Sequence, residues 1–252
     1  TDVQHAPNDQ NLHFVDVILP LEKGQEYVLK IDKERREGLR HSHTATHLLH
    51  AALRQVLGDH THQAGSLVEP DYLRFDFTAM DPMTPRELKS VEELVNQKIW
   101  EAINVETTIT DPETGRKMGA LALFNGKYGD KVRVVQIDDF STEFCGGTHC
   151  SNTSQIGIFK ITSESAVGAG MRRIEAVTSK KAYEYLAERS SLLDDIQEEV
   201  KATKAENIID KIDSLESDLH DSQKQVEELN KQINSAKSKD LFNNVKDVND
   251  LT

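Results

Sequence analysis

The 252-residue chain is acidic, with 43 aspartate and glutamate residues against 30 lysine and arginine residues and a formal net charge of -13. This balance argues against a broad nucleic-acid-binding surface, because phosphate contacts need clustered basic side chains, although a local basic groove remains possible. Two cysteines five apart, Cys145 and Cys150, would strain to bridge, so we expect free thiols and a reducing, cytoplasmic compartment. No apolar run approaches the roughly 18 residues of a membrane span, no signal peptide is visible, and the first residue is threonine, so we expect a fragment without membrane contact.

Residues 1–38 alternate polar turns with short apolar runs, and Leu12–Leu19 and Glu26–Ile31 are predicted strands. Two or three strands bury little surface by themselves, so we expect the end of a small β-domain here. Lys33–Arg40 then carries several basic residues into the next element. It is either a solvated helical approach or a strip that contacts phosphate.

A helix is predicted from Ser42, which can cap it, to Gly58, which can end it. His43 and His47 lie four apart, so they project from one face of this helix and can present two imidazole nitrogens to a single metal ion. They lie beside an apolar stripe that recurs at the helical spacing i, i+3, i+4. The stripe comprises Ala45, Leu48, Leu49, Ala52, Leu53 and Val56.

Strands and helices then mix without strict βαβ alternation, which indicates one α+β domain over residues 39–178. Leu73–Phe77 alternates apolar and polar side chains and predicts a strand with one face on a core. Thr84–Glu87 forms a capping box with proline at the first helical position, which predicts a helix start. Further strands are expected at Gln63–Val68, Val105–Thr110, Lys131–Ile137, Ile156–Ile161 and Met171–Val177, and a short helix at Glu113–Leu123.

Cys145 and His149 are also four apart, and Gly146 and Gly147 between them indicate a tight turn in which thiolate and imidazole converge. Added to the two helical histidines, this pair gives a set of three nitrogens and one sulfur. Such a set favours Zn²⁺ over magnesium or calcium. The predicted metal ligands are therefore His43, His47, Cys145 and His149.

From Lys180 onward glycine and proline vanish and the charged content rises. Apolar residues spaced alternately by four and three predict a coiled coil, in which Ser222 weakens the seam but can fix its register. The seam could pack against an earlier helix, Ala182 to about Val200, as an antiparallel hairpin, or it could pair two chains. The seam residues are Ile208, Ile212, Leu215, Leu219, Ser222, Val226, Leu229, Ile233 and Ala236.

His43–Leu49 together with Cys145–His149 closely resembles the editing domain of alanyl-tRNA synthetases. Related signatures occur in free-standing alanyl-tRNA editing proteins and, more loosely, in the editing domain of threonyl-tRNA synthetases. The likeness extends through Gln63–Val68, Arg74–Phe77 and Gly170–Thr178, which makes coincidence improbable.

The resemblance implies three parts. Residues 1–38 would be the end of a β-barrel domain, residues 39–178 an editing (deacylase) domain with a zinc site, and residues 179–252 a helical coiled-coil linker or oligomerisation segment. The aminoacylation domain, which uses ATP to attach alanine to its tRNA, would be absent, so the fragment would only edit.

The implied reaction is zinc-dependent hydrolysis of the ester that links serine or glycine to a tRNA specific for alanine. His43, His47, Cys145 and His149 match the family's zinc positions. Thr44, Thr46 and Gln63 are candidate catalytic-pocket contacts to the serine hydroxyl, although the threonines could instead cap or pack and Gln63 could be a surface turn residue. Candidate contacts to the terminal nucleotide are Gly168, Gly170, Arg172 and Arg173, although at least one arginine is expected in a salt bridge because adjacent strand residues face opposite sides.

Four protein ligands would close a tetrahedral zinc site, whereas a catalytic zinc keeps an open position. Coordination could expand when substrate arrives, water could replace one ligand at rest, or zinc could orient the substrate without generating hydroxide. A different class of protein also fits the ligand set. It is a non-catalytic, zinc-stabilised RNA- or protein-binding module whose coiled coil recruits a partner.

Overall fold

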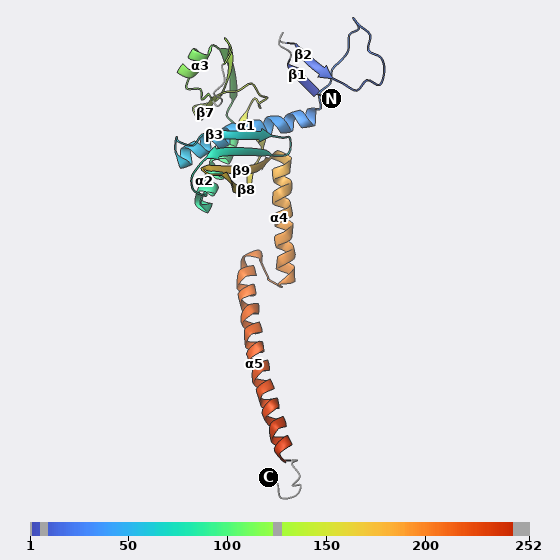
Figure 1. Ribbon diagram of the computed structural model, residues 1–252, viewed down its shortest axis with the longest axis vertical. Coiled ribbons are helices and arrows are strands. Elements are labelled where there is room, and N and C mark those ends of the chain that lie inside the picture. The colour runs from blue at the N-terminus through green and yellow to red at the C-terminus, as the bar shows by residue number, and fades with distance from the viewer. Residues whose placement is uncertain (1, 6–9, 123–127, 244–252) are drawn as a thin grey trace.

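The computed structural model describes residues 2–5, 10–122 and 128–243, and it confirms the α+β class (Figure 1). Two long helices extend as an arm from a body that contains the three sheets and the other helices of the described chain. None of the helices in the described ranges is long and apolar enough to cross a membrane.

The N-terminal segment contains one two-stranded sheet. β1 (Asp2–His5) pairs antiparallel with β2 (Asn11–Phe14), and residues 15–32 contain no strand. The strand predicted at Glu26–Ile31 is therefore wrong, and the first predicted strand is confirmed only over its start. The apolar side chains here have no second layer to pack against, and Val28, for example, is 86% exposed. No closed barrel forms in the described part of this segment.

Helix α1 (Lys33–Leu57) begins nine residues earlier than its predicted cap at Ser42, which lies buried inside the helix. Its N-cap is Asp32, whose carboxylate accepts a hydrogen bond of 3.0 Å from the backbone N–H of Arg35. Aspartate is as good an N-cap residue as serine. The lysine, glutamate and arginine residues that follow Asp32 are good helix formers, so the basic stretch is the first part of the helix. The helix ends at Gly58 as predicted, where φ is +114°.

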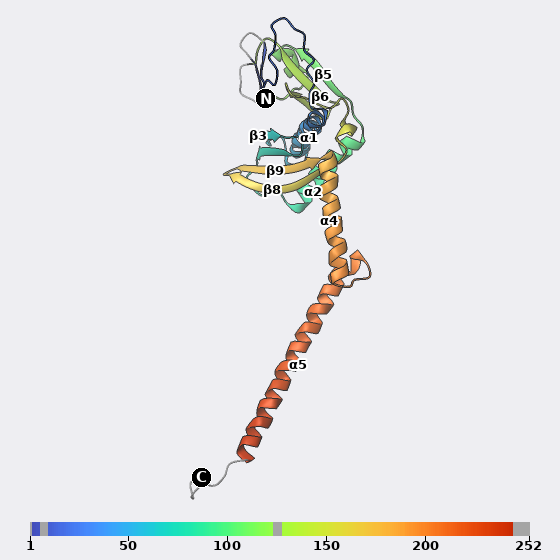
Figure 2. The same ribbon diagram turned by 90° about the vertical axis from the view of Figure 1, so that its right-hand side faces the viewer.

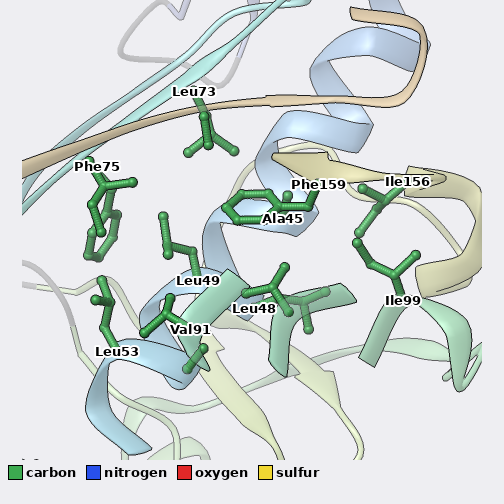
Figure 3. Close-up of a cluster of buried hydrophobic side chains, with 14 of the residues drawn as sticks. Ala45, Leu48, Leu49, Leu53, Leu73, Phe75, Val91, Ile99, Ile156 and Phe159 are labelled. Carbon is green, nitrogen blue, oxygen red and sulfur yellow. The ribbon is translucent and has the colours of Figure 1, made fainter. Parts of the chain in front are cut away.

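The main core lies between helices α1 and α2 and one face of a four-stranded antiparallel sheet (Figure 3). The strict alternation predicted in β4 is confirmed, because Leu73, Phe75 and Phe77 are fully buried. The capping box that opens α2 (Pro85–Trp100) is also confirmed at Thr84 and Glu87. The sheet order is β3 (Gln63–Val68), β4 (Leu73–Thr78), β9 (Met171–Thr178) and β8 (Phe159–Gly168).

A second, three-stranded antiparallel sheet has the order β5 (Val105–Thr110), β6 (Val132–Ile137) and β7 (Ser141–Phe144). Strand β7 was not predicted, because it has only four residues. It nevertheless leads directly into Cys145.

Two sequence predictions need correction at their ends. Helix α3 (Pro112–Lys117) is shorter than predicted, since Gly119 adopts a φ of +87° just after it; its predicted end at Leu123 lies outside the described residues. The start of the strand predicted from Ile156 is instead the end of a 3₁₀ turn, η1 (Thr153–Ile156).

Helix α4 (Ser179–Glu199) leaves the body, and a short 3₁₀ turn, η2 (Ala205–Asn207), connects it to α5 (Ile208–Asn243). Figures 1 and 2 show α5 continuing away from the body instead of folding back along α4. The antiparallel hairpin is therefore not formed, and the α5 seam lies exposed within this chain from Leu215 onward, whereas Ile208 at its start is buried.

Candidate metal centre

The structure brings together the four predicted metal ligands. Helix α1 supplies His43 and His47, and the turn after β7 supplies Cys145 and His149; their ligand atoms all lie within 4.8 Å of one another. The sulfur of Cys145 lies 3.4 Å from Nε2 of His43 and 3.3 Å from Nε2 of His149. A tetrahedral zinc ion with bonds of about 2.3 Å to sulfur and 2.0 Å to nitrogen would separate such atoms by about 3.5 Å. The donor set and its spacing therefore fit Zn²⁺.

The two glycines of the turn have different surroundings. A Cβ atom on Gly147 would overlap the imidazole ring of His43, whereas one on Gly146 would meet no heavy atom within 4 Å. Only glycine at position 147 lets the histidine lie against the backbone of the turn. The close approach of helix and turn thus depends on one missing side chain.

Arg133 on β6 forms hydrogen bonds with the backbone of the Cys145–His149 turn. Its guanidinium donates hydrogen bonds to the carbonyl of Cys145, at 3.1 Å, and to the carbonyl of Gly147. Arg133 was not among the residues predicted for the site. Its signal is a single arginine within the apolar strand Val132–Ile137, which does not reveal what the side chain contacts.

The outward nitrogens of two of the imidazoles lie near oxygen atoms of other side chains. Nδ1 of His149 lies 3.2 Å from Oγ1 of Thr44, which also accepts a hydrogen bond of 3.0 Å from the backbone N–H of Cys150. Nδ1 of His47 lies 3.6 Å from a carboxyl oxygen of Glu143. Glu143 was likewise not predicted for the site, although it stands only two positions before Cys145.

Burial sets the protonation of the cluster. It lowers the pKa of His43 to about 4 and that of His149 to about 3, and nearby positive charge, including that of Arg133, adds to both shifts. Burial also holds the pKa of His47 well below its ordinary value and raises the pKa of the Cys145 thiol. Near pH 7 the three imidazoles are therefore neutral, which is the form that can offer a lone pair to a metal.

A pocket of about 460 Å³ opens beside the cluster and includes His43, His47 and Cys145 in its wall. Of the three predicted substrate contacts, Thr46 and Gln63 line it. Thr44 does not line it; the residue is fully buried and contacts His149 instead.

The polar side chains in the pocket wall already make some hydrogen bonds. The hydroxyl of Thr46 donates to the carbonyl of Ser42 at 2.8 Å, and the amide of Gln63 donates to Ser66 at 3.0 Å. Lys131 and Arg133 make one part of the wall basic.

The other predicted substrate contacts lie outside this pocket. Gly168 and Gly170 belong to the turn between β8 and β9, and Gly170 lines a different pocket. Arg172 makes a two-pronged ion pair with Glu164, and Arg173 makes one with Asp76 at 2.7 and 2.9 Å. Their contact with a substrate stays a prediction.

Comparison with known proteins first defines the class of domain. Residues 132–175 match the family model of the threonyl and alanyl tRNA synthetase second additional domain. The matched range begins at β6, contains the whole Cys145–His149 turn and ends in β9. The metal-type turn thus lies in a range that is similar to a domain described for threonyl and alanyl tRNA synthetases.

Over its full length, the chain is similar to proteins of one of these two kinds, the alanine–tRNA ligases. The chain is 85% identical over 252 residues to an alanine–tRNA ligase of Lactobacillus helveticus, 84% identical to that of Lactobacillus acidophilus, and 51% identical over 251 residues to that of Ligilactobacillus salivarius. It matches these relatives along all of its length but spans only 29%, 29% and 28% of theirs. The chain is thus similar over its whole length to a segment of these alanine–tRNA ligases, which confirms the resemblance predicted from the two motifs.

Proposed function

We propose that this segment edits mischarged tRNA. It would hydrolyse the ester between serine or glycine and the 3′-adenosine of a tRNA specific for alanine, in the cytoplasm and with Zn²⁺ bound by His43, His47, Cys145 and His149. The observation that carries the proposal is the convergence of these four side chains beside a pocket of about 460 Å³. Attachment of alanine with ATP would belong to the parent enzyme.

The wall of the pocket offers groups suited to an aminoacyl ester at the end of a nucleic acid. Zinc, when bound, supplies Lewis-acid polarisation or orientation of the ester. Lys131 and Arg133 place positive charge where the terminal phosphate of the tRNA would approach. The acidic chain therefore has a local basic surface at this pocket.

Gln63 and Thr46 are suited to recognise the hydroxyl of serine. The amide NH₂ of Gln63 is engaged by Ser66, and its side-chain oxygen has no hydrogen-bond partner among the described residues, so it can accept from a substrate hydroxyl. Alanine would leave this oxygen unpaired in the closed complex, which disfavours binding of the correct aminoacyl group. Glycine lacks the hydroxyl as well, so its selection over alanine would depend on its smaller size.

The experiment compares the deacylation of seryl-, glycyl- and alanyl-tRNA, all specific for alanine, by the zinc-loaded chain. We expect seryl- and glycyl-tRNA to lose their amino acid faster than alanyl-tRNA. Gln63→Ala should reduce the seryl-to-alanyl rate ratio roughly tenfold, the effect of losing one hydrogen bond to the substrate. Gln55→Ala, on α1 and in the wall of another pocket, is the matched control and should leave the ratio unchanged. Failure of the zinc-loaded chain to hydrolyse any of the three esters would contradict the proposal.

The second candidate function is the non-catalytic zinc-stabilised module. The complete set of four ligands favours it, because structural zinc sites are closed in this way. It predicts that the chain binds zinc and loses thermal stability when zinc is removed, yet leaves all three esters intact. The pocket that shares His43, His47 and Cys145 with the cluster favours editing, since a closed structural site needs no such access.

We also propose that α5 pairs with α5 of a second copy. From Leu215 onward its seam is exposed in the single chain; Leu219 and Leu229, for example, are 60% and 55% exposed. Helix α5 has 36 residues, which corresponds to about 54 Å of helix at 1.5 Å per residue. A second copy would cover the seam along several heptads.

A further inference from the structure

The carboxyl group of Glu143 lies in the interior between two histidines of α1. Glu143 is 2% exposed, and its Oε1 accepts a hydrogen bond of 2.8 Å from Nδ1 of His50, which is also 2% exposed. Its second oxygen, Oε2, lies 3.6 Å from Nδ1 of His47. His47 and His50 are three residues apart and therefore share one face of the helix.

The orientation of this carboxyl group is fixed at several points. His50 holds Oε1, and the hydroxyl of Ser141 donates to the same atom at 3.4 Å. The backbone of β7 is held in register with β6, where Glu143 stands opposite Val135. With one oxygen and the backbone fixed, the other oxygen can only face His47.

In the part of the chain that the structure describes, no acceptor forms a hydrogen bond with Nδ1 of His47. Oε2 of Glu143, at 3.6 Å, lies just beyond hydrogen-bond distance of this nitrogen. A neutral imidazole carries one proton and one lone pair on its two nitrogens, so a carboxyl oxygen facing Nδ1 favours the proton there. Nε2 then keeps its lone pair.

We propose that Glu143 is a positioning residue for the metal centre, which holds His47 in the Nδ1–H tautomer and thereby leaves Nε2 free to bind the ion. The inference rests on the proposed metal site and is independent of ester hydrolysis. Carboxyl groups that orient metal-binding histidines in this way commonly contribute 10–100-fold to metal affinity. Strand β7 thus contains Glu143, which orients His47, and leads directly into the ligand Cys145.

A purely structural role for Glu143 makes a different prediction. If the carboxyl group only anchored β7 to α1, its bond to His50 would suffice, and the second oxygen would not affect His47. Glu143→Met would then leave the tautomer of His47 as it is in the unmodified chain. The tautomer of His47 separates the two roles because an anchor would not change it.

The test is nitrogen-15 NMR of the histidine side chains in the metal-free chain, with His47 assigned from the spectrum of His47→Gln. We expect His47 to be mainly the Nδ1–H tautomer in the unmodified chain. Glu143→Met, which has a similar length but no carboxyl oxygen, should shift it toward Nε2–H, the form favoured by free histidine in water. His50→Gln keeps a donor to Glu143 and should leave His47 unchanged.

Zinc affinity, measured by competition with a chromophoric chelator, gives the second readout. Glu143→Met should weaken zinc binding by roughly 10–100-fold. The matched control is Glu164→Met, which also removes a glutamate, with a side chain only 7% exposed, but one that pairs with Arg172 in the other sheet; it should leave zinc affinity within about twofold. A predominantly Nε2–H form of His47 in the unmodified chain would overturn the proposal. An unchanged His47 tautomer in Glu143→Met would also overturn it. Failure of the zinc-loaded chain to cleave esters would refute only the proposed function.

Discussion

Gly147 is the residue that allows the helix and the turn to meet at the metal centre. The sequence predicted the ligands at His43 and Cys145, because helical spacing and a glycine turn are local patterns. It could not predict Glu143 or Arg133 as their supports, since the contacts of both residues join different elements. The importance of Gly147 over Gly146 likewise appears only in the folded chain.

The two glycines make a matched pair for mutation. Gly147→Ala should displace the ring of His43 and weaken zinc binding by roughly tenfold or more. Displacing a ligand should lower zinc affinity at least as much as removing a residue that orients a ligand. Gly146→Ala should bind zinc as the unmodified chain does, since its Cβ would enter open space. Chelator competition measures both affinities. Equal affinities would show that His43 does not need this close approach.

The two cysteines allow a similar comparison. Cys145→Ala should lower bound zinc and deacylation together, because it removes the only sulfur of the cluster. Cys150→Ala should keep both, since this buried thiol is not among the four clustered ligands. Metal analysis of the purified variants gives the answer directly. Unchanged zinc in Cys145→Ala would remove this residue from the ligand set.

At the scale of elements, strands and helices with strong local patterns were predictable and weakly marked ones were not. The alternation of apolar and polar residues predicted strand β4 correctly, and the capping box predicted the start of α2 correctly. Helix α1 was predicted to start too late, because Asp32 caps it far upstream of the apolar stripe. Residues 15–32 have strand-like composition, but no neighbouring layer in the described chain buries them.

The pair between Asp76 on β4 and Arg173 on β9 should make the sheet sensitive to acid. The hydrogen bonds from Arg173 lower the pKa of Asp76, so the folded state favours its ionised form. Its contribution to stability is therefore present above the ordinary aspartate pKa of about 3.9 and is lost as pH falls through the lower folded value.

We expect the free energy of unfolding of the unmodified chain to fall more steeply below about pH 4 than that of Asp76→Asn. Urea unfolding at a series of pH values measures the difference. Asp81→Asn, which changes an exposed loop aspartate, serves as the control and should retain the steep fall. Parallel curves for the unmodified chain and Asp76→Asn would show that the pair does not stabilise the fold.

At the scale of the whole molecule, the sequence predicted a coiled-coil seam but left its partner open. The structure removes one alternative, because α5 extends away from α4 (Figure 2). An α-helix this long with an exposed apolar seam has a strong reason to associate. The periodicity could not decide this point, since a seam looks the same whichever helix covers it.

Substitution of the seam tests the proposed pairing of two copies. Leu219→Asp with Leu229→Asp should reduce the mass measured by light scattering to that of one chain, 28.3 kDa, because two charges would be buried in each seam. Ser217→Asp with Lys224→Asp places acidic residues on the opposite face of α5 and should leave the mass unchanged. An unmodified chain that already has the mass of one copy would contradict the pairing.

The most direct test of the editing function is to titrate zinc into chelator-stripped chain while the hydrolysis of seryl-tRNA specific for alanine is followed. If the centre of His43, His47, Cys145 and His149 supports the reaction, the rate should rise with added zinc and reach a plateau at one equivalent per chain. The same titration of Cys145→Ala should show little increase. Full hydrolytic activity in the stripped chain, with no response to zinc, would contradict the account.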